Sequence, residues 1–270
     1  MIRKLCVTLP GLLASGTAAA DWTLNMTRGV TELSAETYDL HMMVFWWCVA
    51  IAIVTFGAMI WSLVAHRKSR GVEPAKFSHS MKAEVIWTAI PIVILLLMAI
   101  PAAETLVKIE DGRDPDMTLV VTGYQWKWHY RYQDEGIDFY SNLDRTSDRA
   151  RRLNSGVDPA SVENYLLDVD NRVVVPKGKK VRVLITSNDV LHAWWVPDLA
   201  IKKDAIPGFV NETWFQAEEA GVYFGRCAEL CGKDHGFMPV VVEVVEPEDY
   251  DTWVAARQAE QNPNEALAAN

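Results

Sequence analysis

The sequence predicts a two-helix transmembrane hairpin followed by an external all-β domain. Two long apolar runs occupy residues 42–65 and 85–107, and short Val-, Trp- and Tyr-rich runs bounded by turn residues fill most of the chain beyond residue 111. Charge divides in the same way: residues 1–108 carry 9 Lys and Arg against 7 Asp and Glu, whereas residues 109–270 carry 17 against 28, a net charge of −11. An acidic external domain disfavours nucleic acid as a partner and suits a basic protein.

Residues 1–20 are typical of a signal peptide. Arg3 and Lys4 precede a short apolar stretch, and residues 18–20 are small alanines suited to cleavage. A short buried helix is the alternative, but it would not require this order of charge, apolar run and small residues. The mature chain is expected to begin near Asp21, with residues 21–41 forming an external N-terminal segment.

The two apolar runs have the length and composition of membrane spans. Residues 42–65 contain no charged side chain, and residues 85–107 contain only Glu104. Each run can cross a hydrocarbon core of about 30 Å, where only helices satisfy their own backbone polar groups. The loop at 66–84 is rich in Lys and Arg, which places it in the cytoplasm and both flanking segments outside.

Glu84 stands at the cytoplasmic mouth of the second span, and two interpretations are open from its chemistry alone. A carboxylate at a helix N-terminus is favoured by the helix dipole and needs no further role. An ionisable residue at a membrane mouth can also take up protons for a pathway within the membrane.

Residues 112–246 predict an antiparallel β-sandwich or barrel. The polar segment 144–164 is expected to be a partly helical surface insertion. Residues 247–270 are expected to form a C-terminal helix over 249–258 and then a loose tail. Examples of the expected β runs are 117–122, 125–133, 172–175, 181–186, 213–217, 222–226 and 239–245.

A cluster of soft metal ligands lies between the last two β runs. The motif C-x3-C-x3-H-x2-M comprises Cys227, Cys231, His235 and Met238, and His192 lies upstream. Thiolate, thioether and imidazole together favour copper. A mononuclear blue site uses one thiolate, so the second thiolate is explained if both sulfurs bridge two coppers. Met238 would complete one ion, and the backbone carbonyl of Glu229 would complete the other.

Other chemistry could explain the two cysteines alone. Outside the membrane they could form a disulfide, and a C-x3-C motif could serve copper delivery or thiol redox exchange. A plain disulfide gives no role to Met238 or to the two histidines.

These motifs carry a resemblance that covers nearly the whole mature chain. The sequence resembles subunit II of haem–copper cytochrome c oxidases of the aa3 type, in a bacterial form with a signal peptide. The matching motifs are E-V-I-W-T-A-I-P (84–91), G-Y-Q-W-K-W-H-Y-R-Y (123–132), V-D-N-R-V-V-V-P (169–176), D-V-L-H-A-W (189–194), D-A-I-P-G (204–208) and C-A-E-L-C-G-K-D-H-G-F-M-P (227–239).

The resemblance implies a cupredoxin-like external domain of the Greek-key type that holds the binuclear copper A centre. Its ligands would be His192, Cys227, the Glu229 carbonyl, Cys231, His235 and Met238. The Glu229 side chain would reach a magnesium ion shared with subunit I, Trp126 would receive electrons, and Glu84 would admit protons.

The implied activity is that of the electron-receiving subunit of a proton-pumping terminal oxidase in the bacterial plasma membrane. Electrons from cytochrome c would pass to haem in subunit I, where oxygen is reduced to water. Subunits I and III would be partners, and this chain would bind no haem.

Two residues depart from the family pattern. Tyr124 replaces a frequent His, and Arg131 replaces an acid that helps to dock cytochrome c. We therefore expect the docking face to be spread over other acidic residues, namely Asp134, Glu135, Asp138, Asp170 and Asp189.

Three related functions fit less well. A quinol oxidase subunit lacks the copper ligands, and a nitrous-oxide reductase would need a second, His-rich domain, whereas this chain has six His. A membrane-anchored copper chaperone would need an exposed, labile site.

Overall fold

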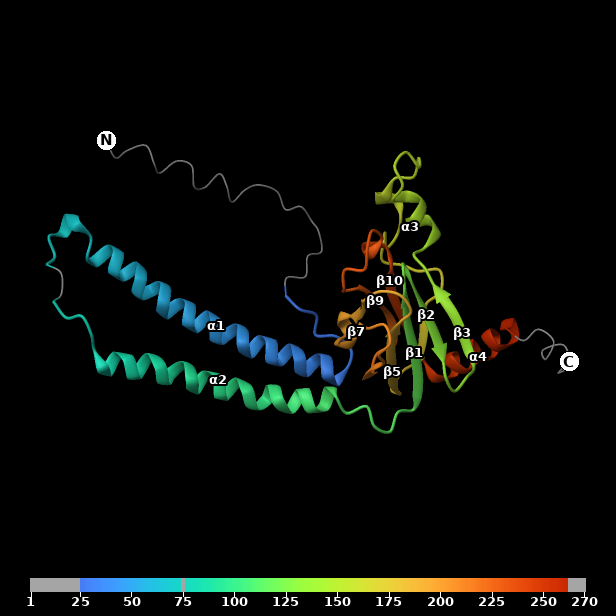
Figure 1. Ribbon diagram of the computed structural model, residues 1–270, viewed down its shortest axis with the longest axis horizontal. Coiled ribbons are helices and arrows are strands. Elements are labelled where there is room, and N and C mark those ends of the chain that lie inside the picture. The colour runs from blue at the N-terminus through green and yellow to red at the C-terminus, as the bar shows by residue number, and fades with distance from the viewer. Residues whose placement is uncertain (1–24, 74–75, 262–270) are drawn as a thin grey trace.

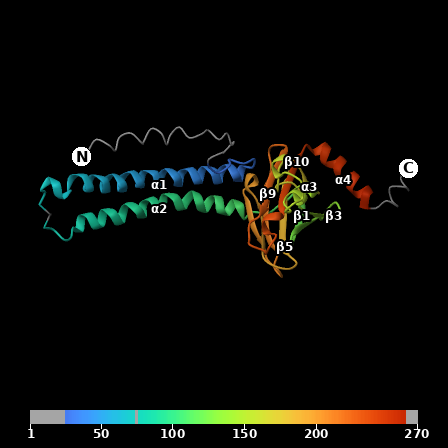
Figure 2. The same cartoon turned by 90° about the horizontal axis from the view of Figure 1, so that it is seen from above.

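The computed structural model describes residues 25–73 and 76–261 (Figure 1). The expected signal peptide and the end of the C-terminal tail lie outside these ranges. Two long helices run side by side away from one flank of a β domain, as both views show (Figures 1 and 2). The predicted combination of an apolar helical hairpin with an all-β domain is confirmed.

The hairpin consists of α1 (Glu32–Ala65) and α2 (Met81–Ile109), with a 3-10 turn at Lys68–Arg70 between them. The first helix begins ten residues before the expected span, because Thr31 and Ser34 cap its N-terminus reciprocally. Its 34 residues measure about 50 Å, well beyond a hydrocarbon core of about 30 Å. The first turns of α1 therefore stand outside the bilayer, beside the β domain.

The second helix also begins before its expected boundary. Ser80 caps it, so Glu84 lies in its first turn and not in the connecting loop. Pro91 and Pro101 lie within this helix, as is tolerated in membrane spans where neighbouring groups satisfy the freed backbone.

Polar contacts fix the outer end of the hairpin. Glu36 of α1 forms an ion pair with Lys108 of α2. The Val30 amide donates to the carbonyl of Asp198 at 2.9 Å, and the Val30 carbonyl accepts from the Glu218 amide at 2.9 Å. The segment that enters α1 is thus bound to the β domain.

Two five-stranded sheets form the β domain. The strand order is β3-β2-β1-β5-β8 in one sheet and β4-β10-β9-β6-β7 in the other. The strands are β1 (Met117–Tyr124), β2 (Lys127–Tyr132), β3 (Ile137–Ser141), β4 (Val173–Pro176), β5 (Lys180–Ser187), β6 (His192–Val196), β7 (Ile201–Ala205), β8 (Asn211–Gln216), β9 (Gly221–Cys227) and β10 (Pro239–Val245).

Side chains from both sheets fill the space between them. Burial alternates strictly along β1 and β5, as expected for strands with one face toward a core. Tyr130 and Tyr132 of β2 are fully buried, and their hydroxyls bind the opposite sheet. The Tyr132 hydroxyl donates to the Val174 carbonyl at 2.9 Å, and Trp194 donates to Tyr130 at 3.2 Å. These bonds satisfy polar groups that would otherwise be costly to bury.

The strand pattern departs from the prediction in two ways. The sandwich was expected to be antiparallel, but β1 pairs with β5 and β4 with β10 in parallel. Strands β3, β6 and β7 were not expected. The first and last of these are five-residue edge strands with polar residues, and edge positions tolerate such composition.

Helical elements flank the sandwich. The expected insertion forms α3 (Arg145–Ala150) and a 3-10 turn at Pro159–Ser161. At the C-terminus, α4 (Pro247–Gln261) packs Trp253 against Tyr132, with ring centroids 5.1 Å apart. Strand β2 therefore runs from the turn that holds Trp126 toward the surface that α4 covers.

Candidate metal centre

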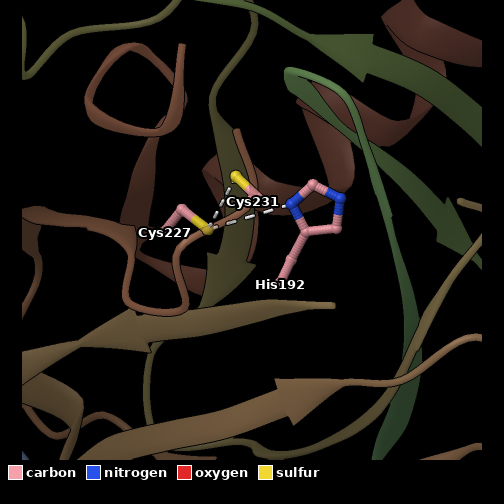
Figure 3. Close-up of side chains that lie close together, drawn as sticks. All are labelled: His192, Cys227 and Cys231. Atoms are coloured by element: carbon pink, nitrogen blue, oxygen red, sulfur yellow. Dashed lines mark hydrogen bonds between the residues drawn. The ribbon is translucent and has the colours of Figure 1, made fainter. Parts of the chain in front are cut away.

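The predicted copper ligands come from strand ends and one loop. His192 begins β6, Cys227 ends β9, and Met238 directly precedes β10. Strands β9 and β10 are antiparallel neighbours, so the loop between them returns to the place where it left the sheet. Figure 3 shows the His192 ring nitrogen directed at the two sulfurs.

The structure brings the donor atoms of the predicted ligand set together. The two thiol sulfurs lie 3.8 Å apart. Cys227 Sγ lies 3.9 Å from His192 Nδ1 and 3.3 Å from the Glu229 carbonyl oxygen. Cys231 Sγ lies 3.6 Å from His235 Nδ1 and 3.5 Å from Met238 Sδ. Each sulfur is therefore surrounded by donors from the other ligands.

Burial and hydrogen bonds hold these groups in place. His192, Cys227, Cys231 and Met238 are buried. Asp189 Oδ1 lies 2.9 Å from His192 Nε2, which leaves Nδ1 free to face the sulfurs. A Cβ at Gly123 would lie 2.8 Å from the His192 ring, so only glycine allows this approach.

Asp189 was expected on the surface as a docking charge. It lies on the surface and also supports a predicted ligand, and the spacing D-x2-H was the signal for this contact. Gln125, which was not singled out, donates to the Cys231 carbonyl at 3.0 Å.

The thiols of Cys227 and Cys231 differ in acidity. Burial raises the pKa of Cys231 to about 12, and the charge of a neighbouring Cys227 thiolate adds to this effect. Burial also opposes ionisation of Cys227, but hydrogen bonds from His192 and backbone amides outweigh it and lower the pKa to about 7. A metal that uses both thiolates must therefore displace a proton from Cys231.

The donor set fits copper better than a disulfide or zinc. Both cysteines are free, and a disulfide would need sulfurs about 2.05 Å apart. Zinc would use two Cys and two His but would leave the buried thioether of Met238 without a role. Two thiolates, two imidazoles, a thioether and a carbonyl within contact of each other suit a soft, thiolate-bridged metal pair.

Trp126 lies on the turn between β1 and β2, directly against the ligand loop. Its indole Nε1 donates to the Cys231 carbonyl at 3.1 Å. Its ring is partly exposed and lines a hollow of about 410 Å³. Asp170, Arg145 and Arg151 also line this hollow.

The other acidic residues expected to dock cytochrome c are not gathered around Trp126. Asp134, Glu135 and Asp138 lie at the far end of the β2–β3 hairpin. The carboxylate of Glu135 accepts from Tyr250 of α4 at 2.8 Å, and that of Asp138 lies 3.0 Å from His129 Nε2.

Glu84 lies at the far end of the hairpin. Its Oε1 is 2.9 Å from Nδ1 of His79, a residue that sequence reasoning did not single out. The imidazole and the carboxylate are both open to solvent.

Comparisons with known proteins agree along the chain. The family described as "Cytochrome C oxidase subunit II, periplasmic domain" matches residues 117–245, and the one described as "Cytochrome C oxidase subunit II, transmembrane domain" matches residues 19–104. A probable cytochrome c oxidase subunit 2 of Rickettsia bellii is 40% identical over 252 residues, which cover 92% of this chain and 90% of the relative.

More distant relatives include mitochondrial proteins. Cytochrome c oxidase subunit 2 of Vigna unguiculata is 37% identical over 94% of this chain and 66% of the relative. Among solved structures, this chain is similar to the periplasmic domain of subunit II (CoxB) of Bradyrhizobium japonicum. The two sequences are 40% identical, the match covers 54% of this chain and 96% of that domain, and the TM-score is 0.47.

The Rickettsia relative is matched over nearly its full length, and the two family matches cover both the helical hairpin and the β domain. This chain belongs to the cytochrome c oxidase subunit II family.

Proposed function

We propose that this chain is the electron-receiving subunit of a proton-pumping cytochrome c oxidase. It takes electrons from cytochrome c at a binuclear copper A centre and passes them to haem in subunit I, where oxygen is reduced to water. The observation that carries this proposal is the convergence of the six donor groups in a member of this family.

The copper pair, when bound, supplies one-electron redox chemistry, and the protein supplies fixed geometry and burial. Cys227 and Cys231 would hold the pair together with His192 and His235, and Met238 and the Glu229 carbonyl would complete the set of ligands. The contact of Asp189 with the buried ring of His192 orients this imidazole. Donors that are already in place need little rearrangement when an electron is gained or lost.

Glu229 is placed to serve two metals. Its carbonyl faces Cys227, whereas its side chain is exposed at the tip of the ligand loop. The next residue, Leu230, is 78% exposed, which suits a surface that another subunit covers. We assign the Glu229 carboxylate to a magnesium ion shared with subunit I, and subunit III completes the membrane assembly.

Trp126 is the proposed point at which electrons enter. Its ring is open to a partner in the hollow, and its indole reaches the backbone of a ligand cysteine. A haem edge seated against this ring would therefore be connected to the copper pair through one hydrogen bond and one residue.

Charge around the hollow is mixed. The external part carries a net charge of −11, which steers a basic cytochrome c over long range. Asp170 is the expected docking acid that lines the hollow, whereas Asp134, Glu135 and Asp138 act from a distance. Arg145 and Arg151 also line the hollow, beside Asp148 and Asp234, so side chains of both charges face its interior.

Protons are proposed to enter at Glu84. Its place in the first turn of α2, with His79 in hydrogen-bond reach, gives a solvent-open pair of titratable groups at the mouth of the span. The basic loop beside it supports a cytoplasmic location for this end, in the plasma membrane of a bacterium. The β domain and the mature N-terminus then lie on the periplasmic side.

The copper pair can be tested in the purified oxidase by electron paramagnetic resonance. We expect the hyperfine pattern of one unpaired electron shared by two copper nuclei, and Cys227→Ser should abolish it because one bridge is lost. Glu229→Gln should keep this pattern, since its carbonyl remains, but should lower the bound magnesium measured by elemental analysis. A single-copper pattern in the unmutated oxidase would refute the proposal.

Trp126 can be tested by rapid kinetics. Trp126→Ala should slow reduction of the copper centre by cytochrome c at least about tenfold, equivalent to about 1.4 kcal/mol, because an aromatic anchor is lost. Reduction by a small inorganic reductant should stay unchanged, which controls for damage to the centre. Unchanged kinetics with cytochrome c would exclude this residue as the point of electron uptake.

Docking charge can be tested by comparing two isosteric variants. Asp170→Asn should lower the second-order rate with a basic cytochrome c at low salt, and the difference should vanish at high salt because charges are then screened. Glu260→Gln on α4 removes the same charge far from the hollow and should have a smaller effect. Equal effects of the two variants would mean that only net charge matters.

Glu84→Gln tests proton uptake, since glutamine keeps the shape of the side chain but cannot release a proton. Oxidase turnover should fall severely, while copper content and copper reduction by cytochrome c remain normal. If turnover holds and only thermal stability decreases slightly, Glu84 merely complements the helix dipole, an effect of about 0.3–1 kcal/mol.

A further inference from the structure

We propose that Arg151 is a positioning residue for the copper ligand His235. The guanidinium reaches from the end of α3 to the loop that joins β9 and β10, and it holds the short turn on which His235 lies. This inference rests on the copper function proposed above.

The other ligands are anchored by the sheets or by the β1–β2 turn. His192 and Cys227 belong to paired strands. The Cys231 carbonyl accepts from Gln125 and Trp126, and Met238 adjoins β10. These contacts fix four ligands without help from the insertion.

His235 is supported differently, because it opens the 3-10 turn His235–Phe237 outside both sheets. Its amide donates to the Gly232 carbonyl at 3.2 Å, which is a contact within the same loop. A turn with only local bonds can shift as a unit, and the imidazole would shift with it.

The Arg151 side chain contacts residues at both ends of this turn. One guanidinium nitrogen lies 3.3 Å from Asp234 Oδ1, and the guanidinium carbon lies 4.2 Å from the centre of the Phe237 ring. Asp234 directly precedes His235, and Phe237 directly precedes Met238. The Arg151 side chain is only 24% exposed, so these contacts are partly shielded from water and salt.

The backbone of α3, which carries Arg151, is itself held in place. Asp144 caps α3 through the amides of Thr146 and Ser147, and the buried Ser147 hydroxyl accepts from the Leu166 amide at 3.3 Å. Asp148 binds Arg151 at 2.8 Å from the other side. A planar guanidinium can bridge two carboxylates and stack on a ring at once, which a lysine cannot.

The chain offers a matched control for this residue. Arg152 has the same charge and also pairs with Asp148, but its side chain is 68% exposed. Among the residues that the structure describes, it makes no contact with the ligand loop. Substitution of either arginine would remove one positive charge and one contact within α3. Only substitution of Arg151 would also remove the contacts with the turn that carries His235.

The test uses the full-length subunit in the purified oxidase. In Arg151→Met we expect copper to pass to an added chelator roughly tenfold faster, as for other groups that support a metal ligand. The hyperfine pattern should become unequal between the two coppers, because only the His235 side is loosened. Arg152→Met should match the unmutated oxidase, and Arg151→Lys should recover only part of the difference.

Asp234→Asn separates this role from a general effect on folding. It keeps the size of the side chain but weakens the bond to Arg151, so copper loss should again accelerate. Adding Arg151→Met should then cause a smaller increase than it causes alone, because only the contact with Phe237 remains to be lost. If Arg151→Met fails to assemble, Asp234→Asn decides by the same readouts. Unchanged copper loss and spectrum in Asp234→Asn, or equal changes in the Arg151 and Arg152 variants, would overturn the inference.

If the hyperfine pattern of the unmutated oxidase shows a single copper, the proposed copper pair fails. If that pattern is normal and Arg151→Met leaves it and the copper loss unchanged, only the inference on Arg151 fails.

Discussion

Two hydrogen bonds to one carbonyl connect the parts of the external domain. Gln125 and Trp126, on the turn between the first two strands, both donate to the backbone oxygen of Cys231. The turn belongs to one sheet, and the cysteine belongs to a loop of the other. The position of the Cys231 sulfur therefore depends on how the two sheets are packed, and the aromatic side chains of the core determine this packing.

The contacts around the copper loop differ in their distance from the metal donors. Asp189 touches a ligand directly, Gln125 and Trp126 hold a backbone carbonyl, and Arg151 holds the flanks of a turn. They come from three separate segments of the chain. The site is thus enclosed from several sides, and the segments of Trp126 and Arg151 also line the hollow beside the Trp126 ring.

The sequence was informative where chemistry is local. Five of the six proposed ligands lie within twelve residues, and the residue types of four of them alone indicated a soft metal pair. The apolar spans were equally evident from uncharged runs. The parallel pairs β1–β5 and β4–β10 were not predictable, since strand direction depends on partners far away in the chain. The contact of Asp189 with His192 was not predicted because it appears only once β6 is formed, and Arg151 could not be connected with Phe237 without the fold.

The short segment before α1 has a consequence for the order of folding. Val30 bonds to residues 198 and 218, so the contact closes a loop that contains both membrane helices and most of the β domain. Such long loops form late because their closure costs the most chain entropy. We therefore expect the segment before α1 to reach its final place only after residues 198 and 218 have taken theirs in the sandwich.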